Sequence, residues 1–209
     1  MLGIIQDTVK GGFPMETKSK ISLYDIIVTA LMAAIVFVVT SFLSIKIPTP
    51  AGQTMIKLAN AFMLLAGMLF GGWRGGLAAG LGSMFYDFTD PNYVAEAWLT
   101  FLRFFLMGAI CGGIAWAGGA QGRKPARNLV AGVIASVFST VFYIVKGIVV
   151  LLLGGSAFLP ALIAQSTKIV SSSINIVIAV VVSMALAPTL RRALDSAHIY
   201  DKLRPGKPG

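Results

Sequence analysis

Residues 69–83 read LFGGWRGGLAAGLGS, and the rest of the chain is arranged around this glycine-rich stretch. Gly71–Gly76 predicts a tight turn between two apolar segments, because glycine tolerates backbone angles that other residues avoid. After the turn, Gly76 and Gly80 lie four residues apart. Small residues at this spacing allow two helices to approach closely within a membrane. The stretch therefore predicts two tightly packed membrane helices joined by a short turn.

The composition places the chain among polytopic membrane proteins. Of its 209 residues, 56% are hydrophobic and 12% are charged, whereas a soluble domain carries about 25% charged residues. A disordered chain would need low hydrophobicity and high charge. Cys111 is the single cysteine, which excludes a disulfide scaffold within the chain.

Apolar runs near the length of a bilayer span, about 20 residues, divide the chain into six predicted transmembrane helices. We expect an all-α membrane protein whose transmembrane domain covers 21–190, between a polar segment 1–20 and a basic tail 191–209. Prolines after the first span end it, and 46–55 is expected to be a loop. The predicted spans are about 23–45, 55–71, 75–88, 97–117, 129–153 and 161–190.

The distribution of charge predicts the orientation. The net charge is +9, from 17 basic and 8 acidic residues. If the N-terminus is inside, 12 of the 17 basic residues fall in inner segments. The positive-inside rule therefore favours an N-in, C-in arrangement. This also explains the positive charge without a nucleic-acid partner.

Three cations, Arg103, Lys146 and Lys168, are expected inside predicted spans. At 1.5 Å rise per residue, each lies about 9–10 Å from the outer end of its span. A charge within a span costs about 2.5–3.5 kcal/mol and is a functional candidate by default. The alternative is that each long side chain reaches the headgroups independently. Their common depth favours one outward-facing pocket for a small ligand with carboxylate, carbonyl or ring-acceptor groups.

Polar and aromatic residues near these cations complete the predicted pocket. Gln165, Ser172 and Asn175 share a helix face with Lys168, and Tyr143 lies one turn before Lys146. Aromatic residues near the mouth suit stacking on a flat ring, although an interfacial aromatic belt is the alternative. The predicted ligand-binding residues are Asn60, Asp87, Tyr93, Trp98, Arg103, Tyr143, Lys146, Gln165, Lys168, Ser172 and Asn175.

Motifs for catalysis are missing from the sequence. There is no GxxxxGK[ST] nucleotide-binding motif. His198 is the only histidine and lies in the tail, so no metal-ligand or general-base cluster is expected. We therefore expect no catalytic residues, no metal site and no cofactor.

Three features resemble the substrate-binding S components of energy-coupling factor (ECF) vitamin transporters, over about residues 22–190. They are Ala30 and Ala34 on the first span, the glycine-rich block 69–83, and six short spans with both ends inside. The stretches 47–56 and 86–91, with Thr100-Phe101, are similar to the riboflavin-type group of S components. Members of this group serve different ligands, so the resemblance does not identify the ligand, and no ligand-binding residue is carried over.

The resemblance implies a subunit of the prokaryotic cell membrane that binds a vitamin outside and topples to deliver it inward. Its partners would be a membrane coupling (T) protein and two cytoplasmic ATPases. The small residues Ala30 and Ala34 would dock on the T protein. The loop after the first span would gate the site, through Pro48, Thr49, Pro50 and Gln53.

The ligand and the class of function leave alternatives open. Vitamin B6, pyrimidine or deazaguanine ligands fit a small polar pocket better than riboflavin, whose large apolar ring would not need three nearby cations. A standalone facilitator or proton-coupled porter would transport without ATPases. A third possibility is an assembly subunit in which the buried cations pair with Asp87 and Glu96.

Overall fold

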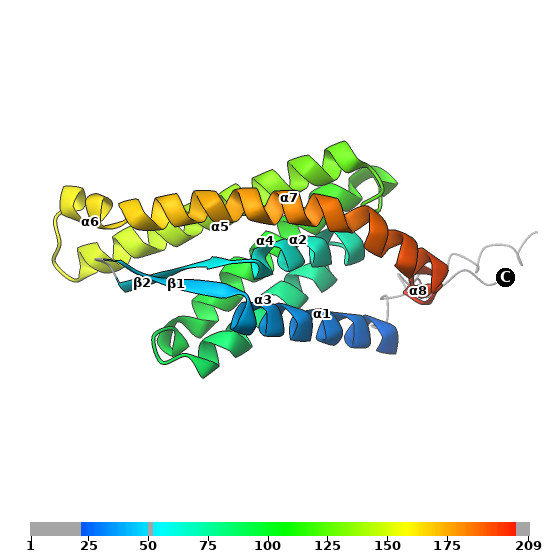
Figure 1. Cartoon of the computed structure of the whole chain (residues 1–209), viewed down its shortest axis with the longest axis horizontal. Coiled ribbons are helices and arrows are strands. Elements are labelled where there is room, and N and C mark those ends of the chain that lie inside the picture. The colour runs from blue at the N-terminus through cyan, green and yellow to red at the C-terminus, as the bar shows by residue number, and fades with distance from the viewer. Residues whose placement is uncertain (1–21, 50–51, 204–209) are drawn as a thin grey trace, which may run out of the picture.

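A computed structural model describes residues 22–49 and 52–203, which form a helical bundle with a β-hairpin set into it (Figure 1). The segment 1–20 and the end of the tail lie outside the described residues. The principal elements are α1 (Leu23–Phe42), β1 (Ser44–Thr49), β2 (Gly52–Lys57), α2 (Ala59–Phe70), α3 (Gly72–Thr89), η1 (Val94–Glu96), α4 (Ala97–Trp116), η2 (Ala117–Gly119), α5 (Pro125–Leu153), α6 (Phe158–Ala164), α7 (Ser166–Ser196) and α8 (Ile199–Lys202).

The long helices run along one axis of the bundle, with α6 at one end and α8 at the other (Figure 1). Helices α5 and α7 lie on one side, α1 lies on the other, and α2 and the hairpin lie between them. Local signals explain several helix starts. Ser22 and Asp25 form a capping box before α1, and Pro125 occupies the first turn of α5. Gly71, with φ of 85°, forms the sharp turn between α2 and α3.

Within the described residues, four helical stretches are long and apolar enough to cross a membrane. They are Leu23–Phe42, Val94–Gly119, Pro125–Leu153 and Ser166–Ser196. Helix α2 has 12 residues, about 18 Å, which is too short to cross alone. Helix α3 has 18 residues and is rich in glycine. Six crossings with both ends inside therefore stay a prediction.

The predicted loop 46–55 is wrong, because β1 and β2 form an antiparallel hairpin there. The same hairpin removes 44–45 from the first predicted span and 55–57 from the second. Alternating β-branched residues favour strands, but the prolines after the first span predict a helix end and a gating loop rather than a strand. Pro48 pairs with Gln53 in this two-stranded ribbon, where a free strand edge tolerates the missing N–H group.

The last predicted span also differs from the structure. The stretch 161–190 is divided between α6 and α7, with the break at Gln165. Helix α7 then continues to Ser196 and includes Pro188. The break turns the chain so that α6 lies at the end of the bundle rather than along it (Figure 1).

Glycines bring the backbones of α2, α3 and α4 into direct contact. A Cβ atom at Gly75 would lie 2.4 Å from the Cα atom of Gly67. A Cβ atom at Gly112 would lie 2.3 Å from the carbonyl carbon of Gly71, and one at Gly108 would lie 2.6 Å from the carbonyl oxygen of Gly75. No side chain fits at these positions without separating the helices. The expectation of close packing around 69–83 is therefore confirmed.

Polar contacts join the chain segments at the α8 end of the bundle. Arg74, in the first turn of α3, forms an ion pair of 2.7 Å with Asp25 of α1. Its guanidinium also donates to the carbonyl oxygen of Leu203 at 3.2 Å. The Arg191 guanidinium of α7 lies 4.9 Å from the ring centre of Tyr200 in α8. These contacts hold the start of α1, the start of α3 and the end of α7 together.

The glycine contact can be tested with two adjacent residues of α4. Gly112→Ala places a methyl group against the backbone of α3, and overpacking of this kind costs about 1–3 kcal/mol. Gly113→Ala is the matched control, because a Cβ atom there meets nothing within 4 Å. Thermal unfolding, measured by the reaction of buried Cys111 with a maleimide dye, should shift downward only in the first variant. Equal midpoints would contradict the packing argument.

Candidate functional site

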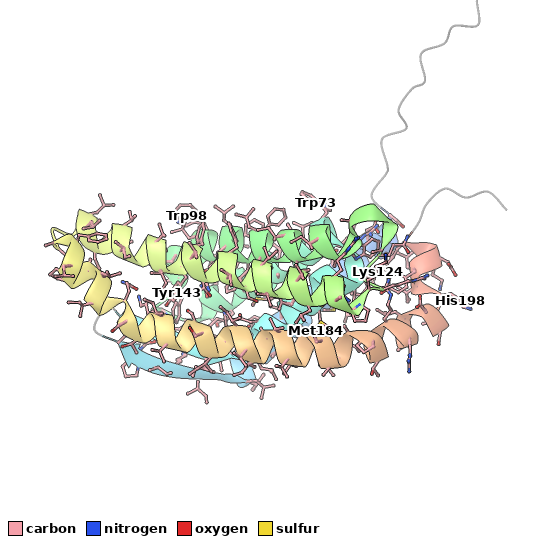
Figure 2. The ribbon with its side chains drawn as sticks, turned by 90° about the horizontal axis from the view of Figure 1, so that it is seen from above. Trp73, Trp98, Lys124, Tyr143, Met184 and His198 are labelled. Carbon is pink, nitrogen blue, oxygen red and sulfur yellow. The ribbon has the colours of Figure 1, made fainter. Side chains whose placement is uncertain are left out.

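A cavity of about 290 Å³ lies in the half of the bundle nearer α6. Its walls come from β2, the start of α2, the end of α3, η1, α4, α5 and α7. Figure 2 shows Tyr143 of α5 in this region, between α5 and α7. The cavity therefore collects residues that are far apart in the sequence.

Ten of the eleven predicted ligand-binding residues line this cavity. They are Asn60, Asp87, Tyr93, Arg103, Tyr143, Lys146, Gln165, Lys168, Ser172 and Asn175. The exception is Trp98, which is 65% exposed and projects from the outer surface (Figure 2). Five residues separate it from Arg103, which corresponds to about 140° around a helix. Trp98 therefore faces away from the cavity.

Three of the predicted gating residues fall on the hairpin, namely Pro48, Thr49 and Gln53. Gln53 of β2 lines the cavity, and its strand partner is Pro48 of β1. The Thr49 hydroxyl donates to the carbonyl oxygen of Gly52 at 3.1 Å. Pro50 lies outside the described residues. The hairpin thus contributes one wall of the cavity.

Side chains from α5 and α7 hold β2 in place. The amide of Asn175 donates to the carbonyl oxygen of Met55 at 2.7 Å and accepts from the N–H group of Lys57 at 2.8 Å. The hydroxyl groups of Thr54 and Ser171 lie 3.0 Å apart. The Tyr143 hydroxyl donates to the carbonyl oxygen of Gln53 at 3.3 Å. Asn175 and Tyr143, predicted as ligand-binding residues, therefore also anchor the hairpin.

A second contact ties the other strand to the end of α3. Lys46 of β1 donates to Asp90 at 2.6 Å. The hydroxyl of Tyr86 lies 3.4 Å from the same carboxylate oxygen. The hydrogen bond with Asp90 raises the pKa of Lys46 above its usual value. Lys46 therefore remains charged at neutral pH and links the hairpin to α3.

Three cations alternate with two aromatic rings along the cavity wall. The Lys57 ammonium lies 4.4 Å from the ring centre of Phe104, and the Arg103 guanidinium lies 4.6 Å from the same ring. The Arg103 guanidinium also lies 4.5 Å from the ring centre of Tyr143. The Lys168 ammonium lies 5.4 Å from that second ring. We refer to Lys57, Phe104, Arg103, Tyr143 and Lys168 as the cation–aromatic ladder.

The ladder is anchored to the bundle at its centre. Nε of Arg103 donates to the carbonyl oxygen of Ser139 at 3.0 Å and to its hydroxyl at 2.8 Å. These two bonds fix the guanidinium between α4 and α5. The remaining nitrogens of Arg103 are the donors that it can offer to an occupant of the cavity.

One cation of the cavity wall has a carboxylate partner in η1. Lys146 of α5 forms an ion pair with Glu96 of η1. Asp87, at the end of α3, is the other carboxylate of the lining and is buried. Pairing cations with Asp87 and Glu96 was expected for an assembly subunit, and it accounts for Lys146 directly.

Several buried polar atoms of the cavity have no hydrogen-bond partner within the described residues. Such an atom costs about 1–3 kcal/mol when it is left unsatisfied. Polar groups on an occupant would relieve this cost. The atoms are Gln53 Oε1, Asn60 Oδ1, Asp87 Oδ2, Tyr93 OH and both amide atoms of Gln165.

Sequence reasoning missed Lys57, Glu96 and Phe104 as cavity residues. Lys57 falls at the start of the predicted second span, 55–71, because the sequence analysis predicts a loop and a helix in place of the hairpin. A charged residue beside an apolar run was the available signal for it. Phe104 carried no signal, since an apolar ring in an apolar span is ordinary.

Comparisons with known proteins support the family and the fold. The family model for the S component of ECF-type riboflavin transporters matches residues 20–192. A UPF0397 protein of Lactiplantibacillus plantarum is 31% identical over 85 residues, which cover 41% of this chain and 45% of the relative. The match thus spans less than half of that protein.

A solved structure, described as the S component of a bacterial ECF transporter, has a similar fold. It superposes with a TM-score of 0.51 at 22% sequence identity, covering 83% of this chain and 96% of that chain. At this level of identity the similarity supports the fold alone.

The anchoring of β2 gives a test of the cavity wall. Asn175→Ala removes two hydrogen bonds to the hairpin backbone and should destabilise the protein by about 1–3 kcal/mol. Ser173→Ala is the control on the same helix, because Ser173 is exposed and bonds only within α7. Hydrogen exchange of the Lys57 amide should accelerate only in the first variant. Unchanged protection would show that the hairpin is held by other contacts.

Proposed function

The chain belongs to the family of S components of ECF-type riboflavin transporters, and from this we propose that its cavity binds a small vitamin-like heterocycle for import. S components are multi-pass membrane proteins that serve as transporter subunits rather than as enzymes. In the proposed cycle, the ligand enters from outside and the subunit delivers it inward by toppling. A T protein and two cytoplasmic ATPases supply the coupling and the energy.

The observation that carries the proposal is the polar cavity among apolar helices. Ionisable residues at membrane depth usually line a substrate path or a water-filled cavity. Here they are gathered into one lining and accompanied by unsatisfied hydrogen-bonding atoms. A binding site for a polar solute accounts for both features.

The size and lining of the cavity support a compact ligand. Its volume of about 290 Å³ is at the lower end of the range for ligand pockets, about 300–1,000 Å³. Aromatic rings and cations suit a flat nitrogen heterocycle with polar substituents. We therefore favour ligands of the vitamin B6, pyrimidine or deazaguanine type over riboflavin.

The proposed orientation puts the α8 end of the bundle inside and the α6 end outside. The basic residues Arg74, Arg123, Lys124 and Arg127 then lie at the inner end, as the positive-inside rule requires. The cavity then lies in the outer half, and the hairpin serves as its gate. Lys46 and Asp90 hold this gate to α3.

The proposed docking face for the T protein is on α1. Ala30 and Ala34 lie four residues apart and are exposed. Their neighbours Ile27, Leu31 and Val38 are exposed apolar residues. A face with small residues at this spacing allows close approach of another helix.

The first experiment identifies the ligand and tests for coupling. Native mass spectrometry of the protein in mild detergent should detect a co-purified heterocycle. Uptake of that compound into proteoliposomes should require the T protein, the ATPases and ATP. Uptake by this chain alone would instead support a facilitator or proton-coupled porter. A protein that neither retains nor binds a ligand would support an assembly role.

The docking face can be tested by one bulky substitution. Ala34→Trp should leave ligand affinity unchanged and reduce uptake at least about tenfold, because the indole blocks close helix approach. Val141→Trp is the control, since Val141 is exposed on α5, away from α1. Normal uptake by the Ala34 variant would exclude this face as the docking surface.

A further inference from the structure

The described residues that line the cavity carry an excess of positive charge. Four are cations, Lys57, Arg103, Lys146 and Lys168, and two are carboxylates, Asp87 and Glu96. Glu96 is engaged by Lys146. Lys168 also interacts electrostatically with Glu96, so Asp87 is the carboxylate of the described lining that acts on both Lys57 and Arg103.

The aromatic rings of the ladder lower the cost of burying the cations but do not neutralise them. A ring offers its negative face to a cation, and this attraction leaves the net charge unchanged. Asp87 interacts electrostatically with both Lys57 and Arg103. One carboxylate between Lys57 and Arg103 leaves one positive charge of this pair uncompensated.

Lys57 and Arg103 are partly buried inside the bundle, and this makes the charge imbalance costly. Uncompensated charge away from water is costly unless it is paired and hydrogen-bonded. Since Nε of Arg103 is held by Ser139, its terminal nitrogens can form the paired donors that match a carboxylate or a phosphate. This arrangement of donors suits the binding of an anion.

We infer that the imported ligand carries an oxyanion, a carboxylate or a phosphate, that is held by Arg103 and Lys57 of the ladder. This inference rests on the proposed function, because it assigns the same cavity to the ligand. It adds that a neutral heterocycle alone does not complete the site. The heterocycle then occupies the part of the cavity nearer Gln53, Tyr93 and Gln165, whose polar atoms lack partners in the described structure.

Small oxyanions test the site without knowledge of the ligand. The protein is purified in detergent and freed of co-purified ligand. Benzoate and inorganic phosphate are titrated separately, with chloride at matched ionic strength as the reference. Each thermal midpoint is read from Cys111 labelling. We expect a saturable rise with at least one oxyanion. A larger response to benzoate indicates a carboxylate, and a larger response to phosphate indicates a phosphate.

Substitutions assign the response to the ladder. Arg103→Gln and Lys57→Gln should each weaken oxyanion binding by about tenfold or more. Arg123→Gln is the control, because Arg123 lies in the loop before α5 and pairs with Asp195. If Arg103→Gln does not fold, the Lys57 variant carries the same test.

Asp87→Asn provides a test in the opposite direction. Removing this carboxylate leaves the ladder with a larger excess of positive charge, so oxyanion affinity should increase severalfold. A purely structural loss would not strengthen binding. The inference is overturned if no oxyanion gives a saturable shift beyond chloride. It is also overturned if the shift is unchanged in both ladder variants, or if Asp87→Asn weakens it.

Failure of this inference is distinguishable from failure of the proposed function. A protein that co-purifies with a neutral heterocycle and shows no oxyanion response keeps its proposed function and loses the inference. A protein that binds oxyanions through the ladder but does not support ATP-dependent uptake keeps the anion site and loses the proposed transport function.

Discussion

Backbone contact between α2, α3 and α4 is the constraint on which the rest of the bundle depends. In a bilayer, helices gain little from hiding apolar surface from one another, so close packing has to supply the attraction. Gly67, Gly75, Gly108 and Gly112 provide it, because a Cβ atom at each would lie 3.0 Å or less from a neighbouring helix backbone. These three helices form a compact unit, and the cavity opens where the small residues give way to Asp87 on α3 and Arg103 on α4.

Side chains that line the cavity or lie beside it hold the hairpin in place. Strand backbone at membrane depth has to be satisfied inside the protein or by water in a cavity. Asn175 bonds two backbone groups of β2, and Tyr143 bonds a third. The Thr54 hydroxyl of β2 adds a side-chain contact with Ser171 of α7. Tyr143 also belongs to the ladder. Asn175 and Tyr143, which anchor the hairpin, therefore also line the cavity.

Much of the site could be predicted from the sequence because helix geometry is rigid. A fixed rise places Arg103, Lys146 and Lys168 at one depth, and a fixed rotation groups Gln165, Ser172 and Asn175 with Lys168. The structure places all six in the lining of one cavity. Depth does not determine which way a helix is rotated, and Trp98 shows the consequence. The hairpin could not be predicted from Pro48, because proline ends a helix and also occurs in edge strands. Lys57 was misplaced together with the hairpin.

The charge of the cavity and the closure of the hairpin are linked through Arg103 and Tyr143. The Arg103 guanidinium lies against the Tyr143 ring, and the Tyr143 hydroxyl donates to the backbone of Gln53 in β2. In the proposed site, an anion bound to Arg103 further restrains the Tyr143 ring and, through it, the hairpin. Thermodynamic linkage makes this effect reciprocal, so a closed hairpin raises the affinity for the anion by the same factor. In the proposed cycle, an occupant that pairs with the buried charges and polar atoms of the cavity therefore favours the closed hairpin. The hairpin borders α1 at Leu43 and Ser44. In the proposed cycle, ligand binding therefore acts through the hairpin on α1, the helix that carries the proposed docking face.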